Sequence, residues 1–87
     1  MAEIDYKFNE DKYIAELKEY IDKTYGQHYA QDDGIQTLEF IKSMGDYSGF
    51  CKGNAIKYLS RYGKKEGKNR KDLIKTLHYV LLLLDEE

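Results

Sequence analysis

The sequence has no proline and only one cysteine among its 87 residues. The lack of proline, the lack of strand-like alternation, and a high content of Lys, Glu, Leu, Ile and Tyr predict an all-α fold. A single cysteine excludes a disulfide framework within the chain and favours a reducing, cytoplasmic environment. A chain of this length forms one domain that buries roughly two-thirds or less of its unfolded surface, so oligomerisation would stabilise it.

Long apolar runs are also lacking. The longest, Val80–Leu84, is too short to cross a bilayer, and Glu3, Asp5 and Lys7 interrupt any apolar run near the amino terminus. We therefore expect no membrane span and no signal peptide, and a soluble protein of the cytoplasm.

Apolar residues recur at three- and four-residue spacing in four segments, which predicts a compact bundle of about four short helices in one domain, 1–87. Asp33 and Gln36 are spaced as a capping box, and Asn69 with Asp72 has the same spacing. Glycines mark the ends of three helices. The expected helices run from Asn9 to Gly26, from Asp33 to Gly45, from Asp46 or Ser48 to Gly63, and from Asn69 through Leu84.

The last of these helices is apolar nearly all round at its end. One stripe faces a single side, but several further apolar residues fall outside it, and such a helix must be covered on several sides. Three other short helices are too few for that, so we expect a homo-oligomer with an interface at Val80–Leu84. The stripe consists of Leu73, Leu77, Val80, Leu81 and Leu84, and the residues outside it are Ile74, Leu82 and Leu83.

The net charge of −2 hides a strong polarity along the chain. Residues 1–46 carry five Lys against eleven Asp or Glu, a net of −6, whereas residues 47–84 carry nine Lys or Arg against two acids, a net of +7. This distribution favours a local anion site over a basic coat for nucleic acid. The alternative is that the unlike halves attract each other, within the fold or across a dimer.

The third helix carries the most informative pattern. Asn54, Lys57, Tyr58 and Arg61 fall at i, i+3, i+4 and i+7, so an amide, an ammonium, a phenol and a guanidinium share one side of the helix. This set suits a phosphate-bearing ligand, with a tyrosine available to stack on a base. Alternatively, tyrosines at this spacing line the edge of a core.

The loop after this helix is rich in lysine but is no P-loop. Three residues rather than four separate Gly63 from Gly67, and Asn69 stands where Ser or Thr would hold magnesium. Lys64 could still hold a phosphate at the start of the next helix, and a solvated turn is the alternative. Gly53, inside the third helix, suggests the close approach of a neighbouring helix or of a ligand.

Catalytic and metal-binding patterns are weak. His28 and His78 lie far apart, and Cys51 shares a helix side with Ala55 and Leu59, which predicts a buried thiol and no metal site. Catalytic residues stay unassigned, with only the acids Glu39 and Asp72 considered.

Several of these elements, in this order, resemble the SaV-like family of small bacteriophage proteins. The likeness covers roughly residues 27–84, which would be the family core, and leaves residues 1–26 as a variable amino-terminal helix. Its most specific part is the run from Lys52 to Arg61. The elements that carry the resemblance are His28-Tyr29, Gly34-Ile35-Gln36, Glu39-Phe40-Ile41, Lys52 to Arg61, Lys64, Asp72 to Lys75, and Tyr79.

The resemblance implies nucleotide chemistry, because the family includes a phage enzyme that phosphorylates nucleoside monophosphates without a standard kinase fold. Our leading expectation is a phage protein that captures a nucleotide, such as a host defence signal, between subunits and needs no cofactor. The alternatives are a nucleoside-monophosphate kinase using ATP and Mg²⁺, and a module that binds nucleic acid or a host protein. The expected ligand-binding residues are His28, Tyr29, Lys52, Asn54, Lys57, Tyr58, Arg61 and Lys64, and the family match also includes Asp72 and Lys75.

Overall fold

A computed structural model describes residues 3–25 and 32–86 of the chain. It contains four α-helices and, within these residues, no strand. The prediction of an all-α fold of four short helices is therefore confirmed. The helices are α1 (Glu10–Thr24), α2 (Asp32–Ser43), α3 (Tyr47–Arg61) and α4 (Arg70–Leu84).

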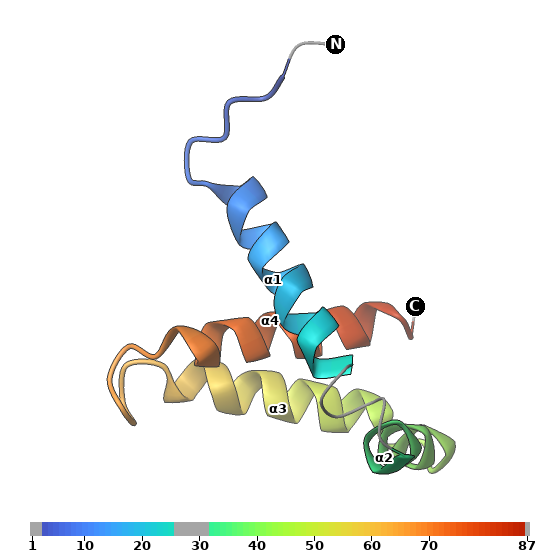
Figure 1. Ribbon diagram of the computed structural model, residues 1–87. Coiled ribbons are helices and arrows are strands. Elements are labelled where there is room, and N and C mark those ends of the chain that lie inside the picture. Colours follow the sequence, from blue (N-terminus) through green and yellow to red (C-terminus); the bar gives the residue numbers. More distant parts are fainter. Residues whose placement is uncertain (1–2, 26–31, 87) are drawn as a thin grey trace.

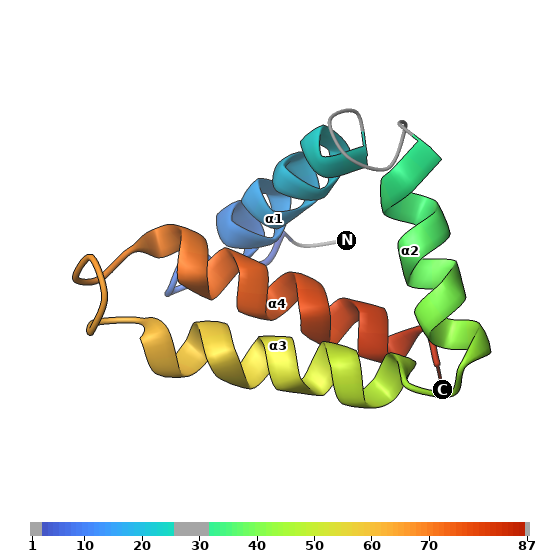
Figure 2. The ribbon, with the colours of Figure 1, turned by 90° about the horizontal axis from the view of Figure 1, so that it is seen from below.

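Helices α3 and α4 form an antiparallel pair that runs the length of the molecule (Figure 1). Most contacts between helices occur in this pair, and smaller contacts join α1 to α4 and α2 to α3. Helix α2 lies across the end of the pair where α3 begins and α4 ends, and α1 crosses α4 on the side away from α3 (Figures 1 and 2). The chain before α1 extends away from the other helices (Figure 1).

Glycine ends two of the helices, as the sequence predicted, whereas Gly26, the predicted end of the first helix, lies outside the described residues. Gly45 follows α2 with φ of 83°, a left-handed conformation that glycine adopts without steric penalty. Its N–H donates to the Lys42 carbonyl at 3.1 Å, and the Asp46 N–H donates to the Ile41 carbonyl at 3.2 Å. These two bonds form a Schellman motif, which satisfies the last carbonyls of α2. Gly63, with φ of 86°, follows the end of α3.

The helix starts differ in their caps. The Asn69 side chain accepts a hydrogen bond from the Lys71 N–H at 3.0 Å and caps α4 as predicted. Asp72 does not reach back to the Asn69 N–H, which donates instead to the Gly67 carbonyl. Asp46 precedes α3 without a side-chain cap bond. Helix α2 begins at Asp32, so the predicted capping residue Asp33 lies inside its first turn, and the side-chain bonds of that capping box lie outside the described residues.

The core lies between α3 and α4 and is small. Cys51 is fully buried, and Ala55 is buried one turn further along α3, which confirms the predicted packing role of the cysteine. Leu59 was predicted on the same side, but 57% of it is exposed. Leu59 lies one more turn toward the loop, where α3 and α4 are joined by the charged pair of Arg61 and Asp72. The buried apolar residues of the described chain are Tyr47, Cys51, Ala55 and Ile74.

Helix α4 turns a different side toward α3 than its apolar stripe predicted. The contacts with α3 come from Asp72, Lys75 and Tyr79. Ile74, which falls outside the stripe, is buried, and so is His78 one turn later, which meets Tyr20 of α1. By contrast Leu77 and Leu84 of the stripe are 45% and 62% exposed. The spacing of apolar residues could not predict which side of α4 faces α3, because this helix is apolar nearly all round. In the described chain, no helix combines the length and the apolar character that crossing a membrane requires.

Helix α1 is only partly covered. No α1 residue is buried, although its apolar residues have helical spacing. Tyr20 meets His78 of α4 edge-on at 5.7 Å between ring centroids, and the Glu16 carboxylate pairs with the Arg70 guanidinium. Because α4 is the one helix that packs against α1 among the described elements, part of the apolar side of α1 faces solvent, with Tyr13 46% and Ile14 66% exposed.

Labelling of Cys51 tests the core. Burial raises the pKa of this thiol, and the side chain has no exposed surface, so both thiolate formation and access are suppressed. We expect Ellman's reagent to label the native protein at least about 100-fold more slowly than the urea-unfolded chain, because labelling requires opening of the α3–α4 contact. Fast labelling of native protein at neutral pH would show that the two helices do not pack around Cys51.

The pH dependence of stability tests the placement of His78, which Tyr20 and Tyr79 flank. Burial lowers the pKa of this imidazole below its usual 6.5, so near neutral pH the unfolded chain binds the proton more readily than the folded chain. The free energy of unfolding should therefore fall as the pH drops through about 6.5 and level off below the folded-state pKa.

Urea denaturation at one protein concentration between pH 5 and 8 measures this slope. A His78→Gln variant should lose most of the slope between pH 5 and 7.5, whereas His28→Gln, which keeps His78, should retain it. Equal slopes in His78→Gln and wild type would contradict the burial of this ring.

Candidate functional site

The structure does not bring all the predicted site residues together. Asn54, Lys57, Tyr58 and Arg61 lie along one side of α3, which faces the seam with α4. Lys52 is exposed and lies on the opposite side of the helix, because two positions before Asn54 turn a helix by about 200°. The predicted ligand residues His28 and Tyr29 lie outside the described residues.

An aromatic row runs along the seam between α3 and α4. The ring of Tyr58 stacks on Tyr79 with centroids 6.0 Å apart and planes 9° from parallel. Phe50 meets the same Tyr79 ring edge-on, also at 6.0 Å. All three rings are half-buried. The row fixes how the two helices face each other at this point and holds Tyr58 in a defined orientation.

Two lysines converge on the Tyr58 ring. The Nζ of Lys57, on α3, lies 4.5 Å from the ring centroid, and the Nζ of Lys75, on α4, lies 5.0 Å from it. Ammonium groups at such distances are attracted by the ring's negative face, by about 0.5–1 kcal/mol at exposed sites. One ammonium from each helix thus lies within 5.0 Å of the centroid of the same ring. Such positive charges suit a group that carries more than one negative charge.

Arg61 is engaged by carboxylates of the chain itself. Its Nε lies 3.8 Å from the Asp72 carboxylate, and its terminal nitrogen lies 3.9 Å from Glu66. Asp72 is only 3% exposed, and among the described residues neither its Oδ2 nor the Arg61 Nε has a hydrogen-bond partner. Since removing one partner of a buried pair leaves an uncompensated charge, the first role of Arg61 is to neutralise Asp72.

Asn54 lies one turn before Tyr58 on α3, and Lys64 lies in the loop after α3. The Asn54 side-chain nitrogen donates to the Phe50 carbonyl one turn earlier at 2.8 Å, so this amide is partly committed to its own helix. Lys64 is exposed in the loop after α3. The loop is shaped by Gly63 and Gly67 at positive φ and by a bond from the Gly63 N–H to the Gly67 carbonyl at 2.9 Å.

Gly53 lies one turn before Lys57 on α3. No heavy atom of the described chain lies within 4 Å of the place where a Cβ would stand. The expectation that a neighbouring helix of the same chain approaches this glycine is therefore wrong. The approach of a ligand, or of a helix from another copy of the chain, stays a prediction.

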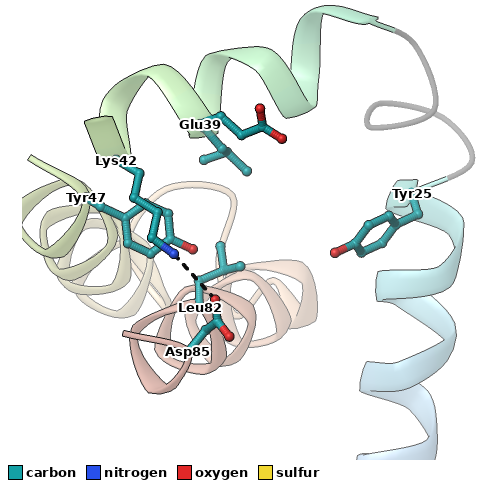
Figure 3. A pocket seen from close by; sticks show the side chains of 7 residues that line it. Tyr25, Glu39, Lys42, Tyr47, Leu82 and Asp85 are labelled. Carbon is teal, nitrogen blue, oxygen red and sulfur yellow. Dashed lines mark ion pairs between the residues drawn. The ribbon is translucent and has the colours of Figure 1, made fainter. Parts of the chain in front are cut away.

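A hollow of about 280 Å³ lies apart from the seam, between α2, the end of α1 and the end of α4 (Figure 3). The hydroxyl of Tyr25 points toward it from one side, and Lys42 and Asp85 face each other on the other side with 3.7 Å between Nζ and carboxylate (Figure 3). Its lining residues are Tyr25, Leu38, Glu39, Lys42, Tyr47, Leu82 and Asp85.

The charges of this hollow make it a poor anion site. Glu39 and Asp85 place two carboxylates around the single ammonium of Lys42, and that ammonium also lies 5.2 Å from the Tyr47 ring centroid. Burial, with the Cys51 thiol beside it, raises the pKa of Tyr47 to about 12, so this phenol stays protonated at neutral pH. Nowhere in residues 3–25 and 32–86 do three His, Cys, Asp or Glu side chains gather as a metal would need.

The cluster at the seam includes two residues that were not predicted as ligands. Lys75 and Tyr79 of α4 complete the surroundings of Tyr58, although the sequence had placed both only among the positions that resemble the SaV-like family. The feature of the sequence that could have indicated Lys75 and Tyr79 is the short loop between Arg61 and Arg70. It forces the two helices to be antiparallel neighbours, so Tyr58 was bound to meet residues of the second helix.

Comparisons with known proteins yield one match. No curated protein and no solved structure matches the chain. The sequence model of the DUF3310 family, described as proteins of unknown function, matches residues 23–81. This stretch covers α2, α3, most of α4 and therefore the whole lysine and tyrosine cluster. Because the match spans more than half of the sequence, the chain belongs to the DUF3310 family of proteins of unknown function.

Proposed function

We propose that this protein binds a phosphate-bearing nucleotide at the seam between α3 and α4, with the phosphates on Lys57 and Lys75. The observation that carries the proposal is the convergence of these two ammonium groups on the ring of Tyr58. Lys57 is exposed and Lys75 is half-buried, so a ligand can reach both from solvent. The resemblance to SaV-like phage proteins adds support, because that family includes an enzyme that acts on nucleotides.

The surroundings of the two lysines favour an anion. Residues 47–84 carry a net charge of +7, and this concentration of positive charge raises the local concentration of anions. Glu66 and Asp72, the two acids of this region, are both paired with Arg61. The single guanidinium offsets one of the two carboxylates, and the net charge of +7 already includes both acids, so the surplus of positive charge comes from the lysines and Arg70.

The arrangement favours recognition of phosphates over recognition of the base. Tyr58 stacks on Tyr79 and carries two ammonium groups near its ring, so little of the ring is left for a nucleobase. We infer that the tyrosine orients the lysines and that affinity follows the number of phosphates more than the identity of the base. Gly53 allows a ligand to approach the α3 backbone one turn before Lys57.

Replacing the two lysines tests the site. Lys57→Ala and Lys75→Ala should each weaken ATP binding by about 1.5–3 kcal/mol, roughly 10- to 150-fold, because each removes a charge-assisted hydrogen bond to phosphate. Isothermal titration calorimetry of purified protein, stripped of copurifying nucleotide and titrated with ATP, AMP and pyrophosphate, measures this loss.

Lys52→Ala is the matched control, because it removes an exposed lysine from the opposite side of the same helix. It should leave the affinity unchanged within about twofold. Equal effects of Lys52→Ala and Lys57→Ala would show a diffuse charge effect and would contradict the proposed site. Arg61→Ala is a poor probe of binding, because it leaves the buried Asp72 carboxylate without its partner and so lowers stability as well.

Substitution of Gly53 separates stability from binding. Gly53→Ala should raise the free energy of unfolding by roughly 0.5–1 kcal/mol, because alanine has the higher helix propensity and its Cβ meets no atom of the described chain. If the ligand approaches the backbone here, the same variant should bind ATP more weakly. Thermal unfolding and calorimetry on one preparation give both values, and a stabilised variant with unchanged affinity would remove Gly53 from the site.

A nucleoside-monophosphate kinase is the second candidate, because the same cations would neutralise a phosphoryl group in transfer. Lys57, Arg61 and Lys64 would then hold phosphates, with ATP and Mg²⁺ as donor and His28 or Asp72 assisting. Against a direct role of Asp72, its side chain is almost fully buried and faces Arg61. Incubation of the protein with ATP, Mg²⁺ and one monophosphate (AMP, dTMP or dGMP), followed by ³¹P NMR, separates the two functions. Steady formation of a diphosphate would establish the kinase and would contradict a function limited to binding.

A module for nucleic acid or for a host protein is the third candidate, and salt separates it from the first. A surface that contacts many phosphates of a nucleic acid loses affinity steeply as salt rises. The affinity of a site with two lysines should fall much less as salt rises.

Capture of a nucleotide would give a phage the means to withhold a host signal from its receptor.

A further inference from the structure

The folded chain leaves an unusually large surface uncovered. Its accessible surface is 7031 Å², whereas a folded monomer of 10.3 kDa exposes about 5,400 Å². Its radius of gyration is 15.0 Å, against about 12 Å for a globular chain of this length. The difference in area, about 1,600 Å², exceeds the roughly 800 Å² that each partner buries in a standard protein interface.

The uncovered apolar surface is concentrated beside the crossing of α1 over α4. Two apolar hollows lie there, with volumes of about 320 and 420 Å³. The first is lined by Tyr13, Arg70, Leu73, Ile74 and Leu77, and the second by Ile14, Leu17, Lys18, Ile21 and Leu81. Ile14 and Leu77 are 66% and 45% exposed, so the chain itself does not fill either hollow. Water in such apolar hollows is replaced favourably by apolar side chains.

The segment before α1 carries side chains that would fit these hollows. Ile4, Tyr6 and Phe8 alternate with polar residues, so in an extended conformation they lie on one side, and they are 70%, 43% and 75% exposed. The chain turns at Asn9 with φ of 59°, and the Phe8 N–H donates to the Glu10 carboxylate at 3.1 Å. This turn directs the segment away from the chain's own α4 (Figure 1).

We propose that this protein forms a dimer in which residues 3–9 of each copy dock beside the α1–α4 crossing of the other, with Phe8 and Ile4 in the two hollows. The exchange buries apolar side chains of both the segment and the hollows, which a monomer leaves exposed. The charges are compatible with the same occupant, because the segment carries Glu3 and Asp5 against Lys7, and the exposed Lys71 follows Arg70, whose guanidinium pairs with Glu16. The interface adjoins Val80–Leu84, where the sequence predicted a contact between subunits.

This dimer is independent of the nucleotide site. The lysines and tyrosines of that site lie on the seam between α3 and α4, whereas the proposed interface lies on α1 and on the side of α4 that faces α1. A chain that fails to dimerise could still bind ATP, and a dimer could fail to bind it. The two proposals are therefore separately testable.

Sedimentation velocity of the full chain over a range of concentrations tests the dimer. We expect a dimer for the wild type and a dissociation constant at least about 30-fold higher for the double variant Ile4→Ser, Phe8→Ser, since each apolar side chain returns to water. The matched control is Ile56→Ser, Leu59→Ser on α3, whose side chains are 61% and 57% exposed but lie outside the proposed interface. All four residues are exposed, so circular dichroism should show unchanged helix content in both variants.

Disulfide trapping tests the exchange itself. A mixture of a Phe8→Cys chain with a Leu77→Cys or Leu81→Cys chain should form a covalent dimer on mild oxidation, whereas a mixture with an Ile56→Cys chain should not. Oxidation of the wild-type chain, whose native Cys51 is buried, measures the background of cross-linking. The proposal is overturned by a monomer at all concentrations, by a dimer that the α3 variant rather than the segment variant disrupts, or by a dimer in which neither hollow position cross-links to Phe8→Cys.

Discussion

The packing of α3 against α4 around Cys51 is the contact on which the rest of the structure depends. It buries the thiol completely and is closed near the loop by the Arg61–Asp72 pair. The other two helices add smaller contacts at the edges of this pair. Small cores give little net stability after the conformational entropy of folding is counted. A chain with so small a core therefore relies on whatever covers its remaining apolar surface.

The same contact creates the candidate site. Tyr58 comes from α3, and Tyr79 and Lys75 come from α4, so their convergence exists only while the two helices keep their register. A shift of one helical turn, about 5.4 Å, would separate Lys75 from the Tyr58 ring. The fold and the proposed binding site therefore depend on the same contact between α3 and α4, because the aromatic row along the seam joins residues of both helices.

Much of the fold could be predicted from residues with strong local preferences. Gly45 and Gly63 end helices because left-handed backbone favours glycine, and Asn69 caps α4 because its side chain satisfies a free N–H. The arrangement of the candidate site could be predicted only in part, and its binding role stays a prediction. The spacing placed Lys57 and Tyr58 on one side of α3, whereas Lys52 lies on the opposite side, Arg61 pairs with carboxylates, and Lys75 lies near Tyr58 only through contact with a second helix.

The sequence by itself determined the class of the fold, the approximate bounds of its helices, the burial of Cys51 and the separation of negative from positive charge along the chain. Each of these follows from local preferences or from composition. Only the tertiary structure decided which side of α4 faces α3, because a helix that is apolar nearly all round carries no directional signal. That choice brought Asp72, Lys75 and Tyr79 to α3, while Ile74 and His78 are buried and Leu77 and Leu84 stay exposed. It also joined two lysines distant in sequence, since proximity across a seam depends on packing between helices.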